Sequence, residues 1–555
     1  MAMLIGCIPT AWAQDLVYLE HSETLNYDQD RLPDAQILSG NVCFRHDNAL
    51  MFCDSAYFYE ATNSLDAFGH VRFIQGDTLS GYGDVMYYDG NRKFAKLRKH
   101  VKLVHRATIL TTDSLNYDRI SELAWYYTGG QIKDTVSTLT SVWGQYYPPT
   151  NQATFRKQVH LFNDDMVLDA DTLQYNTGTH VAALVSPTVI VYKDETTILS
   201  SNGWYNTATE QSQLLDRSQI LHIDGKQMTA DTINYNRRTG YGQGLSHFEL
   251  RDTVQKGTLY GDYGELHEYG DQHYVGEHGY VTRHTLLVDW SNDTSYTYIH
   301  ADSIFTEVVP DTLMIITQLD SLTQDTTYRD TTHRQLRAYY NVRAYNKDYQ
   351  AVCDSLLYND KDSIATLYHL PVCWSDSQQV AADLIVVYLK NKTVDYIHGI
   401  DNAIAIKMED FDMFDQMAGK EMFAYIREGE LRQIDVNGNA ETVFYPKEED
   451  GSYIGVNRTQ SSNIKMYLRE QKIDHILFTT STSGTLYPLD QMPENEKKLR
   501  PFFWAEDVRP TDPDDVFRVS KKVVRPSSAA VSAAVEEEEE DKPATQRPAR
   551  NKKKH

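Results

Sequence analysis

Apolar and polar residues alternate along most of the chain in short segments that recur about every 30 residues. The clearest copies read acidic, small, apolar, variable and tyrosine, and lie at residues 113–117, 171–175, 231–235 and 354–358. Looser copies begin at Glu23, Asp54, Asp84, Asp262, Asp302 and Asp383. Alternation with a period of two predicts strands, and a fixed repeat of this length predicts stacked units. The pattern therefore predicts an all-β, elongated repeat fold, either a β-solenoid or a long open β-roll.

Each predicted strand places two large apolar side chains on the same face. Stacked about 4.8 Å apart, such residues form a continuous apolar seam. One interpretation is a closed, fully packed core, and the other is a roll that is open along one side and lined by an apolar groove. The predicted lining consists of Val42, Phe44, Phe58, Val71, Phe73, Met86, Tyr88, Val101, Leu103, Leu115, Tyr117, Val159, Leu161, Leu173, Tyr175, Val189, Val191, Ile233, Tyr235, Leu356, Tyr358, Ile404 and Ile406.

The acidic residue at the head of each copy has two interpretations. It can cap a turn by accepting hydrogen bonds from nearby backbone amides, or it can contribute to a ladder of calcium sites. A calcium ladder requires a dense glycine-rich pattern that the sequence lacks, so turn capping is favoured and no metal site is expected.

The repeat is interrupted between Asp302 and Asp354. The Thr/Asp-rich stretch 306–335 is interpreted as an insertion, a long surface excursion that separates repeats 14–305 from a second segment, 336–490. The periodicity then ends. Residues 491–526 are expected to form an irregular extension. Residues 527–555 combine small residues with blocks of charge, which predicts a disordered tail.

The first residues resemble the end of a secretory signal. An apolar run precedes Ala11-Trp12-Ala13, which has the form of a cleavage site, so residues 1–13 are predicted to be a signal peptide that begins further upstream. The stretch 4–7 also resembles a lipoprotein box that would make Cys7 a lipid anchor. No stretch reaches the 18 apolar residues or so that a membrane-spanning helix needs.

The four remaining cysteines form two local pairs, Cys43 with Cys53 and Cys353 with Cys373. Disulfides within each pair and buried free thiols are both consistent with the spacing. The formal net charge of −25 disfavours a nucleic-acid partner, because phosphates would be repelled. No catalytic motif or phosphate-binding loop is present, so neither enzymatic activity nor a cofactor is expected.

Two kinds of motif together resemble the OstA-like family of lipopolysaccharide-transport proteins, which includes LptA-like members. One is Gly-Asn-Val-Cys-Phe at residues 40–44 and Gly-His-Val-Arg-Phe at 69–73, and the other is the acidic motif that alternates with them. The stretches 438–445, 462–467 and 485–488 fit the same family, and the second half of the chain looks like its long Bacteroidetes-type members.

The resemblance implies a β-jellyroll (β-taco) that binds the acyl chains of lipid A. It also implies a periplasmic protein associated with the outer membrane, and partners of the same fold, LptC-like and LptD-like, joined through edge strands. The chain is longer than a typical LptA-like protein, and the insertion and the charged tail have no counterpart in that family. The alternatives are a structural or adhesive surface β-solenoid that binds no lipid, and a polysaccharide-acting β-helix enzyme.

Overall fold

The computed structural model describes residues 16–519, except 194–195, 269–277, 293, 321–322, 391–392, 428–429, 449, 470–471 and 501. The predicted signal 1–13 and tail 527–555 lie outside the described residues. The chain forms two compact units, Met1–His247 and Phe248–His555. The division therefore falls near residue 247, whereas the sequence pattern had suggested one at the insertion after residue 305.

Unit 1 is a stack of antiparallel strands with two one-turn 3₁₀ helices. Its elements are β1 (Tyr18–His21), β2 (Thr24–Tyr27), β3 (Gln36–His46), β4 (Ala49–Tyr59), η1 (Glu60–Thr62), β5 (Ser64–Gln75), β6 (Leu79–Asp89), β7 (Phe94–His105), β8 (Thr108–Asp118), β9 (Leu123–Tyr126), β10 (Gly130–Lys133), β11 (Thr138–Ser141), β12 (Trp143–Tyr147), η2 (Pro148–Thr150), β13 (Gln152–Phe162), β14 (Met166–Asn176), β15 (Val181–Leu184), β16 (Thr188–Tyr192), β17 (Thr197–Ser200), β18 (Gly203–Asn206), β19 (Gln211–Leu215), β20 (Gln219–Leu221), β21 (Lys226–Thr229), β22 (Thr232–Asn236) and the first part of β23 (Tyr241–Asp252).

Unit 2 continues with the same kind of strand and ends in short helices. Its elements are the rest of β23, β24 (Gly257–His267), β25 (His278–Thr282), β26 (Leu286–Asp289), β27 (Thr297–His300), β28 (Ser303–Asp320), β29 (Thr323–Tyr345), β30 (Gln350–Asn359), β31 (Ile364–Tyr368), β32 (Val372–Ser375), β33 (Gln378–Ala381), β34 (Leu384–Lys390), β35 (Thr393–Asp410), β36 (Met413–Arg427), β37 (Glu430–Phe444), β38 (Val456–Arg469), β39 (Lys472–Thr479), β40 (Ser483–Tyr487), α1 (Glu494–Lys497), η3 (Glu506–Val508) and η4 (Asp514–Phe517).

The long strands bend at a corner in their middle. In β3 the corner is formed by Gly40 and Asn41, with φ angles of 82° and 46°, and in β5 by Gly69 and His70, with 72° and 40°. Two successive left-handed residues turn the strand, and glycine and asparagine tolerate that region best. The pairing register shifts at the same points, between Ser39 and Val42 for example. Every such strand therefore contributes to two walls.

We call the two walls A and B. Wall A contains residues 36–39, 55–59, 64–68 and 85–89 in unit 1 and β31, β34, 393–400, 421–427 and 430–437 in unit 2; wall B contains 42–46, 49–53, 71–75 and 79–83 in unit 1 and β32, β33, 403–410, 413–419 and 440–444 in unit 2. The inner faces meet across the roll, since Phe44 on wall B lies 5.4 Å from Phe58 on wall A, measured between ring centroids. Phe73 and Tyr117 meet in the same way at 5.8 Å.

The recurring acidic residue lies beside a corner. Asp54 Oδ2 lies 2.7 Å from Nδ1 of His70, and Asp84 Oδ2 lies 2.8 Å from Nδ1 of His100. Asn402 donates to Asp383 in the same way, at 2.7 Å. The expectation that these carboxylates cap backbone amides is therefore corrected for these copies. The partner is the side chain of the second corner residue on the following strand, which only the bent register brings into reach.

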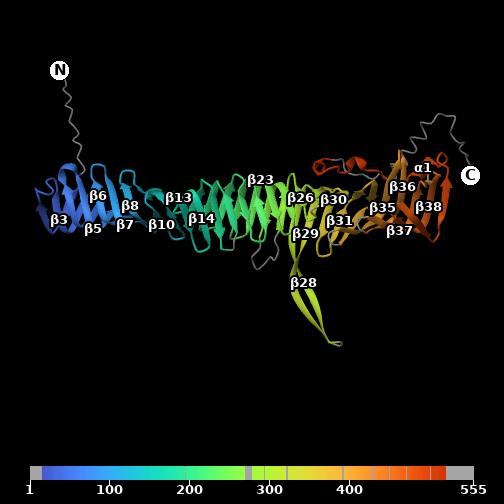
Figure 1. The fold of residues 1–555 in the computed structure, drawn as a ribbon, viewed down its shortest axis with the longest axis horizontal. Helices are drawn as coiled ribbons and strands as arrows, with labels where there is room; N and C mark the ends of the chain where they lie inside the picture. Colours follow the sequence, from blue (N-terminus) through green and yellow to red (C-terminus); the bar gives the residue numbers. More distant parts are fainter. Residues whose placement is uncertain are drawn as a thin grey trace, which may run out of the picture. The chain divides into compact units, whose positions relative to one another are not determined.

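The predicted insertion 306–335 is a regular hairpin. β28 and β29 pair without a break from Ser303↔Tyr339 to Gln318↔Gln324. Figure 1 shows the hairpin leaving the stack of unit 2 as a two-stranded ribbon. The sequence analysis expected a surface excursion here, and its polar composition did not indicate the two long strands.

Residues 488–519, which we call the strap, run back along wall B of unit 2, where Figure 1 shows the red C-terminal segment beside the stack. Two glutamine side chains bind its backbone, and a third binds an arginine side chain. Gln379 donates to the carbonyl of Phe503 at 2.8 Å and accepts from the amide of Ala505 at 2.9 Å. Gln416 similarly donates to Lys497 O and accepts from Leu499 N, both at 2.8 Å. The expected irregular extension is thus a docked segment.

The strap also contacts a buried arginine of β29 and packs on an apolar cluster. Arg343, which is 3% exposed, donates to the carbonyl of Val508 at 2.9 Å. The third glutamine, Gln350, accepts from Nε of Arg509 at 2.8 Å. Beneath the strap lies one apolar cluster, which includes Val352, Val372, Trp374, Ala381, Ile404, Ile406, Phe414, Val443, Met492, Leu499, Ala505 and Val508.

Candidate functional site

The inner face of unit 1 is closed. Most of the predicted lining lies there, and each of these residues is at most 7% exposed: Val42, Phe44, Phe58, Val71, Phe73, Met86, Tyr88, Val101, Leu103, Leu115, Tyr117, Val159, Leu161, Leu173, Tyr175, Ile233 and Tyr235. The structure therefore brings these side chains together as one packed interior. The predicted lining assumed a groove that is open along one side, whereas in this unit the inner face is packed shut.

Two predicted lining residues of unit 1 face outward instead. Val189 and Val191 are 39% and 40% exposed, whereas Ile190 between them is fully buried. Ile190 pairs with Leu168, an inner residue of β14. All residues 189–191 are aliphatic, so alternation alone did not determine which set points inward, and the prediction was out of phase by one residue. Val189 lines a shallow outer pocket of about 300 Å³.

Ile404 and Ile406 are buried, but on the outer face of wall B. In β35 the corner is Asp401 and Asn402, so Ala403 and Ala405 take the inner positions that Val71 and Phe73 hold in β5. Ile404 and Ile406 point the other way and belong to the cluster beneath the strap. The prediction failed here because wall B also carries apolar residues on its outer face, where the strap packs against them, so alternation could not tell the two faces apart.

The inner face of unit 2 is partly open. Leu356, next to the corner of β30, is 8% exposed, as expected for a lining residue. We call the edge of the roll opposite the corners the mouth, and the strand ends that border it the rims. Tyr358 lies on the same face as Leu356, two residues nearer the mouth, and is only half-buried. Val387, Ile397 and Met466, on neighbouring strands of wall A, are also half-buried. Of the lining predicted in this unit, Leu356 and Tyr358 are therefore on the inner face, and the interior there retains accessible apolar surface.

The rims of the two walls are joined across the mouth of unit 1 by polar side chains. Arg119, at the rim of wall A, donates through Nη1 to the hydroxyl of Tyr88 at 2.6 Å and through Nη2 to the carbonyl of His46 at 3.2 Å. It also donates to Asn48 Oδ1 at 3.1 Å and Gln75 Oε1 at 3.2 Å on wall B. Its side chain is only 3% exposed.

Further contacts of the same kind follow along the mouth. Thr108 on wall B donates to Thr177 on wall A, with 3.1 Å between the hydroxyl oxygens. Tyr175 on wall A donates to the Asp134 carboxylate on wall B at 2.6 Å. We call these cross-wall contacts the latch; it consists of His46, Asp47, Asn48, Gln75, Tyr88, Lys93, His105, Thr108, Tyr117, Arg119, Asp134, Tyr146, Tyr175, Thr177 and His180.

Burial shifts the pKa of several latch groups. It raises the pKa of Tyr88, Tyr146 and Tyr175, whose hydroxyls are already protonated at neutral pH. The pKa of His105 is lowered, first by burial and then by the charge of Arg106. The sequence analysis missed the latch, although a signal existed: His46, Gln75 and His105 occupy inner positions of their strands at which alternation calls for an apolar residue.

All four described cysteines are free thiols. Val42, an inner residue, pairs with Cys53, so Cys43 and Cys53 point to opposite faces of wall B and cannot be bridged without moving the backbone. Cys353 and Cys373 share the inner face of unit 2 but are diagonal neighbours rather than partners. Burial raises the pKa of both Cys53 and Cys373 to about 12.

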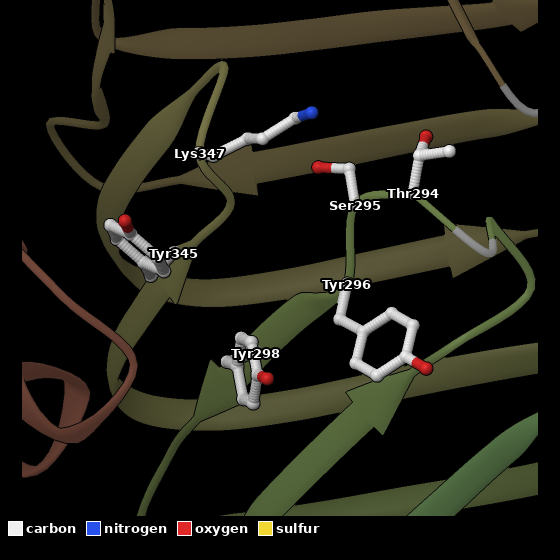
Figure 2. Close-up of a pocket in the computed structure, with 6 residues that line it drawn as sticks. All are labelled: Thr294, Ser295, Tyr296, Tyr298, Tyr345 and Lys347. Atoms are coloured by element: carbon white, nitrogen blue, oxygen red, sulfur yellow. The ribbon is translucent and has the colours of Figure 1, made fainter.

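A pocket of about 290 Å³ lies outside the roll of unit 2, and it is lined by Thr294, Ser295, Tyr296, Tyr298, Tyr345 and Lys347 (Figure 2). It belongs to the outer surface rather than to the inner face. Within the described part of the chain, no group of three or more His, Cys, Asp or Glu residues is placed to hold a metal ion. None of the described helices has the length and apolar character needed to cross a membrane.

Comparison with known proteins bears on the N-terminal part of the chain. Residues 14–171 match the family model described as OstA-like protein. No curated protein matches the chain. Among solved structures, one match is LptH, the LptA homologous periplasmic component of the lipopolysaccharide transport device from Pseudomonas aeruginosa, with 15% identity over 18% of this chain and 76% of that chain. Its TM-score is 0.17, so that likeness carries no further argument. The resemblance expected from the sequence motifs is confirmed: residues 14–171 are an OstA-like region.

Proposed function

We propose that the chain is a periplasmic bridge protein that binds lipopolysaccharide and carries it toward the outer membrane. The cargo's acyl chains would lie on the inner face of the roll, and partners of similar fold would pair with the end strands. Binding would then require no cofactor and no chemical step. The OstA-like match of residues 14–171 supports the class of function.

The half-exposed inner face of unit 2 is the observation that favours a conduit over a closed scaffold. Tyr358, Val387, Ile397 and Met466 offer apolar surface that the fold does not bury by itself. Covering such surface with an acyl chain stabilises a complex by about 25 cal/mol per Å², or about 0.8 kcal/mol for each buried methylene. A structural or adhesive solenoid, the alternative function, gains nothing from leaving this surface open.

The end strands offer a route for assembly. In β1 and β2, Tyr18, Leu25 and Tyr27 are 55–57% exposed, and at the other end Leu486 of β40 is 53% exposed. Strand addition to such edges is a known mode of protein association.

Photo-crosslinking tests the proposal. A benzophenone amino acid replaces Tyr358 on the inner face of wall A or, as the control, Tyr388, which is also half-buried but lies on the outer face. We expect lipopolysaccharide adducts in cells from position 358 and at least tenfold fewer from position 388. Equal labelling of the two positions, or none from 358, would contradict lipid binding inside the roll and favour the structural alternative.

A further inference from the structure

We propose that the latch is a gate, which holds the mouth of unit 1 shut and must open before cargo can lie along its inner face. This inference rests on the proposed function and adds a conformational step to it. In the closed state, the predicted lining of unit 1 offers almost no surface to a ligand, since its inner members are at most 7% exposed.

The way the walls are held together favours a gate over a permanent seam. Within each wall, neighbouring strands share continuous backbone ladders, as between β5 and β6. Between the rims, the contacts are side-chain hydrogen bonds and ion pairs such as Lys93 to Asp47 at 2.8 Å. Water replaces such bonds when the groups become exposed, so breaking one costs far less than breaking a ladder. The walls can therefore separate without any strand leaving its sheet.

The corners supply the hinge. In β3, β5, β7 and β13 the corner consists of two left-handed residues, such as Lys99 and His100 in β7, at which the register shifts and the ladder is interrupted. A few residues that absorb a change in φ and ψ are the usual site of hinge motion. A small rotation at each corner opens the distant rim, because the rim lies at the far end of the strand.

Unit 2 shows how the rims are arranged where fewer contacts of this kind cross the mouth. Several of its charged rim residues pair within one wall, since Lys407 and Lys447 bind Glu409 on wall B and Arg427 binds Asp395 on wall A at 2.7 Å. Across the mouth, Arg334 on wall A binds Asp252 on wall B at 2.8 Å.

The inner face beside these rims is only partly exposed, since Ile397 and Met466 are half-buried whereas Met417, Ala424 and Ile434 are at most 6% exposed. In the described residues, the more accessible interior of unit 2 thus goes with rims that are joined across the mouth at fewer places than those of unit 1.

Native thiols provide a test that does not depend on the cargo. Cys53 lies on the inner face of unit 1 and Cys373 on that of unit 2, and burial raises the pKa of both thiols. Each rate is therefore compared with that of the same thiol in the parent protein. In a chain in which Cys43 and Cys353 are replaced by alanine, Arg119→Ala should raise the rate of modification of Cys53 by a small uncharged thiol reagent at least tenfold. The rate at Cys373 should not change. An unchanged rate at Cys53, or an equal rise at both thiols, would overturn the gate.

An engineered disulfide across the mouth provides a second test, which remains informative even if Arg119→Ala unfolds the unit. In a background in which the native cysteines are alanine, Thr108→Cys with Thr177→Cys places a disulfide across the mouth, and Thr24→Cys with Ser39→Cys is the control, because it joins β2 and β3 within one wall. With a benzophenone amino acid in place of Phe155 on the inner face, oxidation of the cross-wall pair should reduce lipopolysaccharide adducts at least tenfold, and reduction should restore them.

The two failures can be told apart. Adducts at position 155 that persist when the cross-wall pair is oxidised would overturn the gate while leaving the proposed function intact. Loss of adducts from position 358 in protein without the engineered disulfide would remove the proposed function, and the thiol rates would then still decide whether the mouth opens. Loss of adducts in the oxidised control pair as well would show a general effect of stapling and would also overturn the gate.

Discussion

The strap offers the most direct measurement of an interaction energy in this molecule. Gln379 is fully buried, and its side-chain amide satisfies two backbone groups of the strap at once, Phe503 O and Ala505 N. Replacing Gln379 with leucine keeps the side-chain volume about the same but leaves Phe503 O and Ala505 N without their hydrogen-bond partner. A buried backbone group left without a partner costs about 1–3 kcal/mol. We therefore expect Gln379→Leu to weaken strap docking by about 2–4 kcal/mol.

Hydrogen exchange followed by mass spectrometry measures this change locally. A loss of 2 kcal/mol at the lower end of the range corresponds to about 30-fold faster exchange of the amide of Ala505, because 1.36 kcal/mol is a factor of ten. Peptides from unit 1 should not change. The matched control is Gln378→Leu, one residue earlier on the opposite face of β33. Exchange at Ala505 that is unaffected by Gln379→Leu, or equally affected by the control, would refute the assignment of this glutamine as a clamp.

Three further predictions follow from burial, backbone geometry and titration. Ile190→Asp should destabilise unit 1 by several kcal/mol in chemical denaturation, since it buries a charge, whereas Val189→Asp on the outer face should change stability by less than about 1 kcal/mol; similar effects would contradict the corrected phase of β16. Gly69→Ala should cost about 1–2 kcal/mol, because its φ of 72° is strained for alanine, whereas Gly257→Ala, at an ordinary φ and with 4.0 Å to the atom nearest a new Cβ, should cost less than about 0.5 kcal/mol; equal losses in thermal unfolding would argue against strain at the corner. Burial raises the pKa of Asp415 to about 7, so the folded state keeps a proton that the unfolded chain releases near pH 4. The free energy of unfolding should therefore fall between about pH 4 and 7 and level off above pH 7. Asp415→Asn should flatten this dependence, and a pH profile of the variant parallel to that of the parent would contradict it.

The sequence predicted the strands and the repeat well because alternation is a local property. It also identified most of the inner face of unit 1, where the outer positions are polar and the phase is unambiguous. It failed at Val189, Val191, Ile404 and Ile406, where consecutive apolar residues or an apolar outer face removed the contrast on which the phase depends. The sequence analysis predicted an open groove, whereas the interior of unit 1 is packed, because alternation gives the direction of a side chain but not the distance between walls.

The strap and the latch depend on contacts that no local pattern contains. Arg343 binds the carbonyl of Val508 across 165 residues of sequence, and Arg119 binds that of His46 across 73. The polar inner residues of the latch were nevertheless visible as exceptions to alternation. A polar side chain at an inner position near a turn marks a rim contact in this fold.

The contacts of the strap are spaced to match the strands beneath it. Its backbone binds Gln379 at Phe503 and Ala505 and Gln416 at Lys497 and Leu499, and its Arg509 side chain binds Gln350. The length of the strap therefore matches a fixed number of strands. Inserting or deleting a hairpin between Gln350 and Gln416 would move these side chains away from their contact points on the strap. In unit 1 the backbone ladders join strands that are close in sequence, so whole repeats can be gained or lost there. Evolution is thus free to adjust the reach of this protein at one unit and is constrained at the other.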